Sequence, residues 1–467
     1  MNYCSEMTNQ KKALKQLTPM NRVHAGPEMQ KAYQVLKEFY PDVEIFSFES
    51  GRNVRNWISP PGWTVHHAYL ISPTGERILD YYRDSILCLY SYSPSFSGTL
   101  SKEELEKHLF SNPNHPHQYP YYFRNMYRFA GGLEWGFCIP HDLREKLPEG
   151  DYQIEIKTEF LDSPMEMAMQ TKAGENPETL LLVGHFDHPA QCGDGLLGCI
   201  AGHEIIERLK NRNTRLTYRM LSTVEIVGSV FYCEERAKTD SVQEVLFTAL
   251  YGVSAPLIYA QSVSEQSHVD RIMKHLLSYE KEENSITHFR GAAGNDEIAF
   301  DVQGVNIPAG SLMRWPYEYY HTSSDTEDKV DYDKFENFIS IIINLIDVLE
   351  QNSTLKLLQN GLPCLSHPNV NLYLSPPSMS GMSESANPTT KALMESLPNE
   401  KARQQAYQAR ENFNQMMTLL PAMADGKTTT FDLAERSGVP FAVVHGYTEL
   451  WVKKGLLEKQ WIHPFKK

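Results

Sequence analysis

One apolar run that ends in histidines and aspartates constrains this chain more than any other feature. The segment LLLVGHFDHPAQCGDGLLGCIAGHEI opens with a strand-like stretch at Leu180–Val183 and continues directly into His185, Asp187 and His188. Asp194 then stands just before a predicted helix. In open α/β sheets, ligands bind outside the carboxyl ends of the strands. The segment therefore predicts an α/β domain with a polar site at one edge of its sheet.

Strand-like and helical segments alternate on both sides of this run. YQIEIKTEF precedes it, and a predicted helix across Leu196–Lys210 leads to the strand-like YRMLSTV. A helical stretch near Val230–Ala237 and an apolar run near Leu257 come next, and FENFISIIINLIDVLEQ is expected to close the domain as a helix. Alternation of this kind is typical of α/β folds.

Length and changes in composition divide the chain into several predicted domains. A chain of 467 residues is too long for one ordinary core. Short strand-like runs rich in Tyr and Trp predict an inserted β-rich domain at 55–145, and a stretch rich in Pro, Ser and Asn predicts a linker or lid at 353–389. We therefore expect a discontinuous α/β domain over 1–54 and 146–352 and a C-terminal domain over 390–467.

The bulk composition predicts a globular protein of the cytoplasm. A net charge of −14 argues against a nucleic-acid-binding surface over the whole molecule, because phosphate binding depends on clustered Lys and Arg. The 7 cysteines are scattered and form no C-x-x-C pair, which indicates a reducing compartment. The most apolar predicted helix is shorter than the roughly 20 residues that a bilayer requires. We expect no membrane partner and no nucleic-acid partner, and the sequence is compatible with a homo-oligomer.

The H-x-D spacing of His185 and Asp187 suits zinc chemistry. Neutral imidazoles and carboxylates bind zinc, and a nearby carboxylate can orient a ligating imidazole. An isolated H-x-D is more often part of an ordinary loop, so the interpretation depends on further residues of this kind elsewhere in the chain.

Glu225 supplies a carboxylate at the same predicted edge. The strand-like TYRMLSTV ends just before Glu225, and Gly228–Ser229 follow. A glutamate in this place could act as the general base that activates water beside a metal. Glu234 and Glu235 are a competing pair, but their position within a helical segment favours a solvated surface.

Two later segments add candidate ligands. GAAGNDEIAF contains Asp296 after a turn of small residues, and YEYYHTSSDTED contains His321. Each segment alone is more typical of a helix cap or a polar surface loop. Their order along the chain, after the histidine-rich segment, makes a shared site the better interpretation.

The ordered set resembles the co-catalytic zinc aminopeptidases of clan MH. The shared order is HFD, then D-G before a helix, E before G-S, N-D, and Y-H-T-S-S-D-T. NWISPPGW, YYFRNMYRFAGGLEWGFCIP and SLMRWPYEYYHTSSDT extend the resemblance to a subgroup with an inserted β domain and a C-terminal winged helix. The resemblance implies a three-layer, aminopeptidase-like mixed α/β sheet that carries both of these additional domains.

The same resemblance implies roles for individual residues. His185 and Asp296 would bind one zinc ion, Asp194 would bridge toward a second, and His321 would bind that second ion. Asp187 would support His185.

The chain departs from the family at its paired glutamates, which serve as general base and metal ligand. Here the pair is Glu225–Ile226, so one of the two functions lacks its residue. We align Glu225 with the base, in which case the second metal lacks a carboxylate ligand and the site holds one zinc ion. If Glu225 is instead the metal ligand, the base is missing, so the number of zinc ions, one or two, stays open. His188 adds a nitrogen that could substitute in the coordination shell.

Two further residues are candidates for substrate binding. Arg314 could hold a substrate carboxylate with its planar guanidinium group, although a surface ion pair is an equal alternative. Tyr320, beside Tyr317 and Tyr319, could line the pocket or donate to an oxyanion.

The C-terminal segment resembles a winged helix. Helical stretches separated by a short polar turn and by Gly438 lead to a strand-like end. Between Gly426 and Lys467, Lys and Arg outnumber Asp and Glu by seven to four, which permits DNA contact without requiring it.

Together these features predict a zinc-dependent hydrolase of the aminopeptidase type, acting on a peptide or small amide. No G-x-S-x-G, Walker or dinucleotide-binding motif favours another chemistry. Two alternatives stay open. One is an amidohydrolase or deacylase acting on a small molecule of polysaccharide metabolism, and the other is a non-catalytic metal-binding regulatory protein that uses its winged helix.

Overall fold

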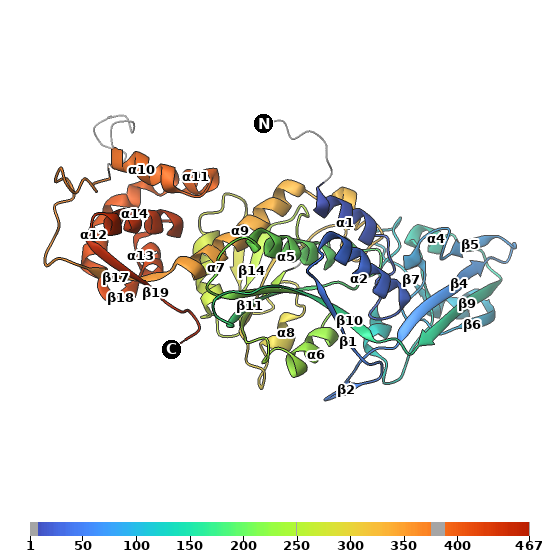
Figure 1. The fold of residues 1–467 in the computed structure, drawn as a ribbon. Coiled ribbons are helices and arrows are strands. Elements are labelled where there is room, and N and C mark those ends of the chain that lie inside the picture. Colours follow the sequence, from blue (N-terminus) through green and yellow to red (C-terminus); the bar gives the residue numbers. More distant parts are fainter. Residues whose placement is uncertain (1–7, 249, 375–387, 467) are drawn as a thin grey trace. The chain divides into compact units, whose positions relative to one another are not determined.

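The structure, a computed structural model, describes residues 8–248, 250–374 and 388–466 (Figure 1). The chain forms two compact units. Of the described residues, those within 1–267 and 283–340 form the first unit, and those within 268–282 and 341–467 form the second.

The first unit is built on an eight-stranded mixed sheet. Its strand order is β1-β10-β12-β11-β13-β16-β14-β15. The strands are β1 (Glu44–Phe48), β10 (Met165–Lys172), β11 (Thr179–His185), β12 (Thr217–Thr223), β13 (Val242–Thr248), β14 (Leu257–Ala260), β15 (Asn284–Thr287) and β16 (Ala309–Arg314).

The central strand β11 explains why the sheet needs cover on both faces. β11 runs parallel to both β12 and β13, and all of its residues are buried. A strand that reads as a continuous apolar run is typical of a parallel sheet with helices on both sides. Figure 1 shows α1, α2 and α5 on one face of the sheet and α6 and α8 on the other. The predicted three-layer α/β fold is confirmed.

The helices predicted near Leu196–Lys210, Val230–Ala237 and the FENFISIIINLIDVLEQ segment are present as α5, α6 and α9, and the unit contains further helices as well. Its helices are α1 (Asn9–Leu17), α2 (Pro27–Phe39), α3 (Lys102–Leu105), α4 (His141–Glu145), α5 (Leu196–Leu209), α6 (Val227–Glu235) and α8 (Glu297–Phe300), with α9 (Tyr332–Gln351) continuing into the second unit. Single 3-10 turns occur at Ile86–Cys88, Glu106–His108, Arg124–Tyr127 and Glu327–Lys329.

The inserted β-rich region forms its own antiparallel sheet, with the order β5-β4-β9-β6. These strands are β4 (Gly62–Ile71), β5 (Arg77–Asp80), β6 (Phe96–Ser101) and β9 (Asp151–Leu161), and short pairs are formed by β2 (Asn53–Val54) with β3 (Trp57–Ile58) and by β7 (Leu109–Phe110) with β8 (Phe137–Cys138). Trp63, Leu70 and Ile154 belong to its separate apolar core. Because β9 pairs with β4 and β6, the chain leaves this sheet near Leu161, later than the expected boundary at residue 145.

The second unit combines helices with a three-stranded antiparallel sheet of order β18-β17-β19. Its elements are α7 (His268–Leu277), β17 (Ser353–Leu357), α10 (Pro388–Ser396), α11 (Glu400–Gln408), the turn Arg410–Asn412, α12 (Phe413–Met423), β18 (Asp425–Thr429), α13 (Thr430–Ser437), α14 (Phe441–Lys453) and β19 (Leu457–Trp461). Thr429 and Asp432 cap α13 reciprocally, and Gly438 ends that helix in a left-handed conformation. Helices beside a small sheet suit a winged helix, which stays a prediction.

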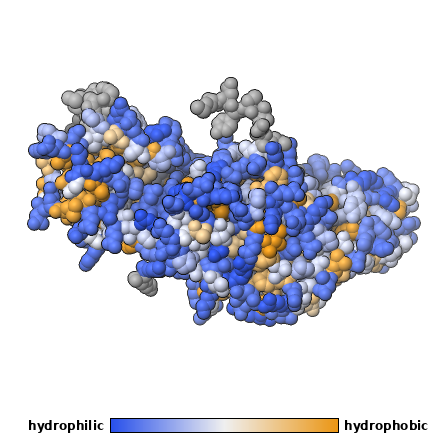
Figure 2. All heavy atoms as spheres, viewed as in Figure 1, coloured by the Kyte–Doolittle hydropathy of each residue, from blue (hydrophilic) through white to orange (hydrophobic). Residues whose placement is uncertain are grey.

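The predicted linker or lid at 353–389 contains β17, which pairs with β18 and β19. Residues 375–387 of that predicted segment lie outside the described residues. On the face shown in Figure 2, hydrophilic side chains cover most of the surface. Among the described residues, no helix has the length and apolar character needed to cross a membrane.

The stability of the first unit should depend on its central strand. Leu182 on β11 is fully buried, so Leu182→Ala is expected to lower the free energy of unfolding by about 2–5 kcal/mol because it leaves a cavity. Urea denaturation measures the change. Val263→Ala, at a side chain that is 57% exposed, serves as the control and should change stability by less than about 0.5 kcal/mol. Equal effects of the two substitutions would contradict the assignment of β11 to the core.

Candidate metal site

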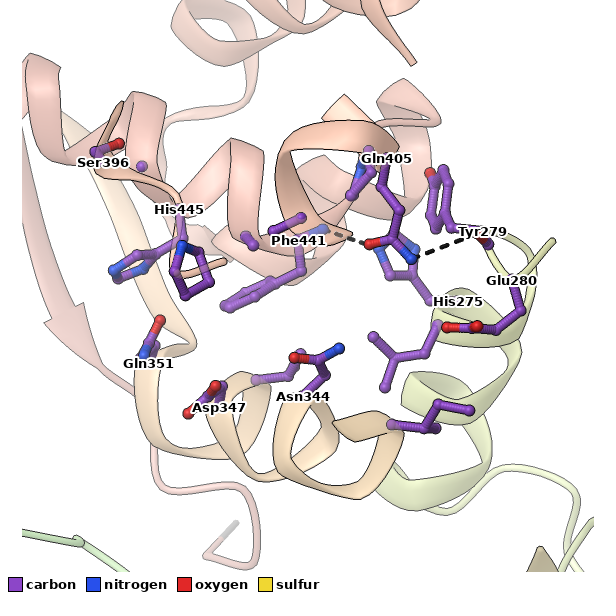
Figure 3. Close-up of a pocket in the computed structure, with 18 residues that line it drawn as sticks. His275, Tyr279, Glu280, Asn344, Asp347, Gln351, Ser396, Gln405, Phe441 and His445 are labelled. Carbon is purple, nitrogen blue, oxygen red and sulfur yellow. Dashed lines mark hydrogen bonds between the residues drawn. The ribbon is translucent and has the colours of Figure 1, made fainter. Parts of the chain in front are cut away.

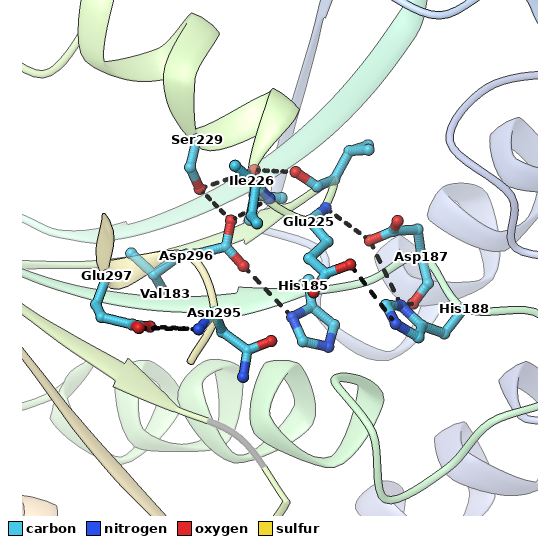
Figure 4. Close-up of polar contacts among 12 residues, drawn as sticks. Val183, His185, Asp187, His188, Glu225, Ile226, Ser229, Asn295, Asp296 and Glu297 are labelled. Carbon is cyan, nitrogen blue, oxygen red and sulfur yellow. Dashed lines mark hydrogen bonds and ion pairs between the residues drawn. The ribbon is translucent and has the colours of Figure 1, made fainter. Parts of the chain in front are cut away.

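Two parallel strands bring the first site residues together. β11 ends at His185, which is paired in register with Thr223 at the end of β12. Glu225 follows two residues later, so His185 and Glu225 leave the sheet at the same edge. Figure 4 shows their side chains meeting there with those of Asp187, His188 and Asp296.

Asp194 is the point at which three imidazoles converge. Its Oδ1 lies 3.1 Å from His185 Nε2, and its Oδ2 lies 2.7 Å from His321 Nε2 and 3.5 Å from His188 Nε2. Asp194, His185 and His188 are buried, and the side chain of His321 is 16% exposed. The site is therefore open to solvent on the side of His321 and of Glu225, whose side chain is equally exposed.

This donor set fits a zinc ion. Two atoms bound to the same tetrahedral zinc at about 2.0–2.1 Å lie about 3.3 Å apart, close to the separations around Asp194. Among the described residues, His185, His188 and Asp194 form a group whose ligand atoms all lie within 4.8 Å of one another. Burial lowers the pKa of His188 to about 4, which keeps its imidazole in the neutral form that binds metals.

Asp296 and Asp187 occupy positions that differ from those that the family resemblance implied. Asp296 Oδ2 lies 3.3 Å from His185 Nδ1, the nitrogen that faces away from Asp194. Its Oδ1 accepts hydrogen bonds from the Ile226 amide at 2.7 Å and from Ser229 Oγ at 2.6 Å. A carboxylate in this position orients the imidazole from behind, the role expected of Asp187.

Asp187 instead contacts the neighbouring loop, which carries Glu225. Its Oδ1 accepts the Glu225 backbone N–H at 2.9 Å, and its Oδ2 lies 3.0 Å from His24 Nε2. The two atoms are close, but the contact does not have the geometry of a well-aligned hydrogen bond. Burial acts to raise the pKa of Asp187, but His24 outweighs this and the pKa falls to about 2.

Glu225 lies beside the imidazole cluster. Its Oε2 accepts a 2.5 Å hydrogen bond from Tyr127 and lies 3.9 Å from His188 Nε2. Burial raises the pKa of Glu225 to about 8. Ile226, which the resemblance aligned with a second glutamate, donates its backbone amide to Asp296, and its apolar side chain offers no ligand atom.

The inserted region contributes residues that sequence reasoning missed. The Tyr121 amide donates to the His321 carbonyl at 2.8 Å, and the rings of Tyr121 and Phe123 lie edge-on to the His321 ring. Tyr320, predicted to contact substrate, stacks on the same imidazole with ring centroids 3.9 Å apart. The aromatic segment YYFRNMY was quoted only for its family resemblance, and nothing in its local pattern indicated a place at the site.

Asp325 holds the loop that carries Asp194. Its two oxygens accept the amides of Gly193 at 2.7 Å and Asp194 at 3.1 Å, and Tyr317 donates to it at 3.0 Å. Tyr317 thus supports Asp325, which in turn holds the backbone of Asp194.

Some predicted residues lie outside this network. Arg314 is fully buried and donates to the Ala255 carbonyl at 3.0 Å, which argues against the alternative of a surface ion pair. Glu234 and Glu235 pair with Arg55 and Arg52, as expected of a solvated surface.

A separate cavity of about 230 Å³ lies within the second unit (Figure 3). Its histidines already have partners, because His275 Nε2 accepts the Phe441 amide and His445 Nδ1 accepts from Lys459. None of the residues that converge on Asp194 lines it, so we place the chemistry in the first unit.

Zinc binding should release a proton. Burial alone would lower the pKa of His185, but Asp194 and Asp296 outweigh it and hold that pKa well above its ordinary value. The metal-free imidazole is therefore protonated at neutral pH and must lose its proton to bind zinc, so affinity rises with pH. Calorimetric titrations of the apoprotein in two buffers of different ionisation enthalpy should show the release of at least about one proton. Identical heats in both buffers would contradict this charge state.

Gly195 should be required for the site to form. It has φ +84°, and a Cβ there would overlap the His185 ring. Gly195→Ala is expected to abolish stoichiometric zinc binding, measured by elemental analysis of the purified protein. Gly75→Ala, at the same φ but with nothing within 4 Å of an added Cβ, is the matched control and should retain zinc. Full zinc content in Gly195→Ala would show that His185 is not a ligand.

The chain is similar in sequence or in structure to several known proteins. The chain is 26% identical over 344 residues, 73% of its length and 77% of the relative, to a Clostridium acetobutylicum protein named for polysaccharide biosynthesis and an aminopeptidase-like domain. A crystal structure from the same organism, described as that of a peptidase, matches with TM-score 0.79 and 23% identity over 97% of this chain and 96% of that one. A zinc aminopeptidase from Bacillus subtilis matches with TM-score 0.53 and 13% identity over 73% and 93% of the two chains.

These structural likenesses show an aminopeptidase-like fold. A family model described as "Domain of unknown function (DUF4910)" matches residues 11–352, which include every residue of the cluster around Asp194. The chain belongs to the DUF4910 family.

Proposed function

We propose that the chain is a zinc-dependent hydrolase of the aminopeptidase type, which cleaves an N-terminal amide bond. The observation that carries the proposal is the convergence of His185, His188 and His321 on Asp194, with the carboxylate of Glu225 beside them. The aminopeptidase-like fold supports it, because this edge of the sheet is where such a fold binds its ligands.

The zinc ligands are assigned from the contacts around Asp194. His185, His188, Asp194 and His321 would hold the ion, and Asp296 would orient His185 from its other nitrogen. A bound zinc supplies Lewis acidity and lowers the pKa of water at the site. Ile226 removes a carboxylate that a second ion would need, so we propose one tightly bound zinc per chain.

Glu225 is assigned the proton transfers. It would take a proton from the attacking water and return it to the leaving amine, as a general base and then a general acid. Its burial and its hydrogen bond from Tyr127 support this assignment, because both hold the carboxyl group in a fixed place beside the imidazoles. Tyr320 stays the proposed substrate contact, since its ring lies on His321 at the solvent-facing side.

A second candidate is the hydrolysis of an acylated small molecule, such as an N-acyl amino sugar. The name of the C. acetobutylicum relative, which refers to polysaccharide biosynthesis, favours this alternative. Both reactions cleave an amide and use the same catalytic residues. They differ only in the substrate that binds beside the aromatic rings around His321, those of Tyr121, Phe123 and Tyr320. The third alternative, a purely regulatory role, is favoured only by the absence of a carboxylate at Ile226.

Replacing Glu225 by Gln tests the mechanism. Glu225→Gln keeps the shape of the side chain but removes its basicity, so turnover of aminoacyl-p-nitroanilides should fall by about 10²–10⁴-fold while zinc content stays near one per chain. Elemental analysis and initial rates measure the two quantities. Glu234→Gln, on the surface of the following helix, is the matched control and should keep wild-type turnover.

The outcomes separate the candidates. Unchanged turnover in Glu225→Gln would contradict the assigned base. Hydrolysis of an N-acetylated amino sugar without hydrolysis of aminoacyl anilides would favour the deacylase, and zinc-loaded protein inactive on both would favour the regulatory role.

A further inference from the structure

The segment between α1 and α2 is hydrogen-bonded to the loop that carries His188, because the carbonyls of Met20 and Arg22 accept the amides of Ala190 and His188. Arg22 and His24 in this segment are both fully buried. The loop is conformationally strained, because His188 has φ +101° and Ala190 has φ +51°. Such a loop persists only when its surroundings hold it in place.

Arg22 supplies that support through the backbone. Its guanidinium donates to the carbonyls of Phe186 at 2.9 Å, His188 at 2.9 Å and Gln191 at 2.6 Å. The Arg22 carbonyl in turn accepts the His188 amide at 2.8 Å. The segment is thus tied to both sides of the strained loop.

His24 reaches the Glu225 backbone through Asp187. His24 Nε2 is 3.0 Å from Asp187 Oδ2, and Asp187 Oδ1 accepts the Glu225 amide at 2.9 Å. All of the side-chain atoms in this path are excluded from solvent, where electrostatic interactions are strong. Asp187 therefore has the His24 ring beside one oxygen and the backbone amide of Glu225 on the other.

His24 also contacts the group that holds the Glu225 side chain. Its ring lies edge-on to that of Tyr127, with centroids 6.0 Å apart, and Tyr127 donates to Glu225 Oε2 at 2.5 Å. The rings of Tyr92 and Phe129 complete its surroundings. The two paths from His24 thus end on the backbone and on the carboxylate of the same residue.

We propose that His24 is a positioning residue for Glu225, acting through Asp187 and Tyr127 without touching substrate or metal. The inference rests on the proposed function for its kinetic consequence, but the packing that it describes exists without turnover. It assigns to the N-terminal segment a part in the active site, and it explains why Asp187 contacts the Glu225 loop and not His185.

The test compares two substitutions of His24 with a buried control. His24→Leu removes the contact to Asp187, whereas His24→Gln retains an N–H donor of similar reach. His203→Leu is the control, because His203 is also fully buried in the first unit and its partners are Gln170 and Ser222. The His203→Leu substitution is expected to lower stability without removing any contact of Asp187.

In His24→Leu, kcat is expected to fall by about 10–100-fold, since small misplacements of a catalytic group cost up to about 10²-fold. KM should stay within about threefold and zinc content should stay unchanged. His24→Gln should recover kcat to within about fivefold of wild type. Hydrogen–deuterium exchange, read by mass spectrometry on a peptide that spans Val224–Val230, should be faster in His24→Leu and unchanged in His203→Leu.

The exchange measurement keeps this proposal separate from the proposed function. If wild-type protein hydrolyses no amide tested, the proposed function fails, and exchange alone decides whether His24 holds the Glu225 loop. Unchanged exchange in His24→Leu, or an equal loss of kcat in His203→Leu, overturns the proposal. If His24→Leu does not fold, Asp187→Asn takes its place, with the same losses expected and the same outcomes contradicting them.

Discussion

The convergence of three imidazoles on one buried aspartate is the constraint on which the rest of the first unit depends. Asp194 is in contact with His185, His188 and His321, which come from two loops separated by more than a hundred residues. A buried carboxylate is costly unless positive charge or a metal compensates it. The parallel register of β11 and β12, the glycine at position 195 and the support of Asp325 all serve to bring this group together.

Asp296 and Asp187 hold different parts of the structure around this centre. Asp296 orients His185 and accepts the Ile226 amide, while Asp187 holds the Glu225 amide and pairs with His24. Ile226 therefore has a defined backbone role even though its side chain cannot replace a glutamate. The arrangement supports the proposal of a single zinc ion, and the inserted region places the rings of Tyr121 and Phe123 against His321.

Much of the site could be predicted because its residues stand beside strong local signals. His185, Asp187 and Asp194 flank a fully apolar strand and a helix, and Glu225 follows the next strand, so periodicity alone indicated one sheet edge. Asp296 and His321 required the resemblance to order them. The contacts of Asp296 with His185 and of Asp187 with Glu225 could not be predicted, because side-chain direction depends on the loop's left-handed residues. Arg314 shows the same limit, since a guanidinium that suits a substrate carboxylate also suits a buried carbonyl.

The sequence by itself determined the α/β layers, the β-rich insertion and the residue types available for metal chemistry, because these follow from local periodicity and from the order of motifs. Only the tertiary structure decided which segments meet at the site. Arg22, His24 and Tyr127 lie far from the histidine loop along the chain, and their own surroundings carry no signal for it. Long-range contacts of this kind are set by the packing of whole elements, so they become visible only when α1, α2 and the inserted region are placed against the sheet.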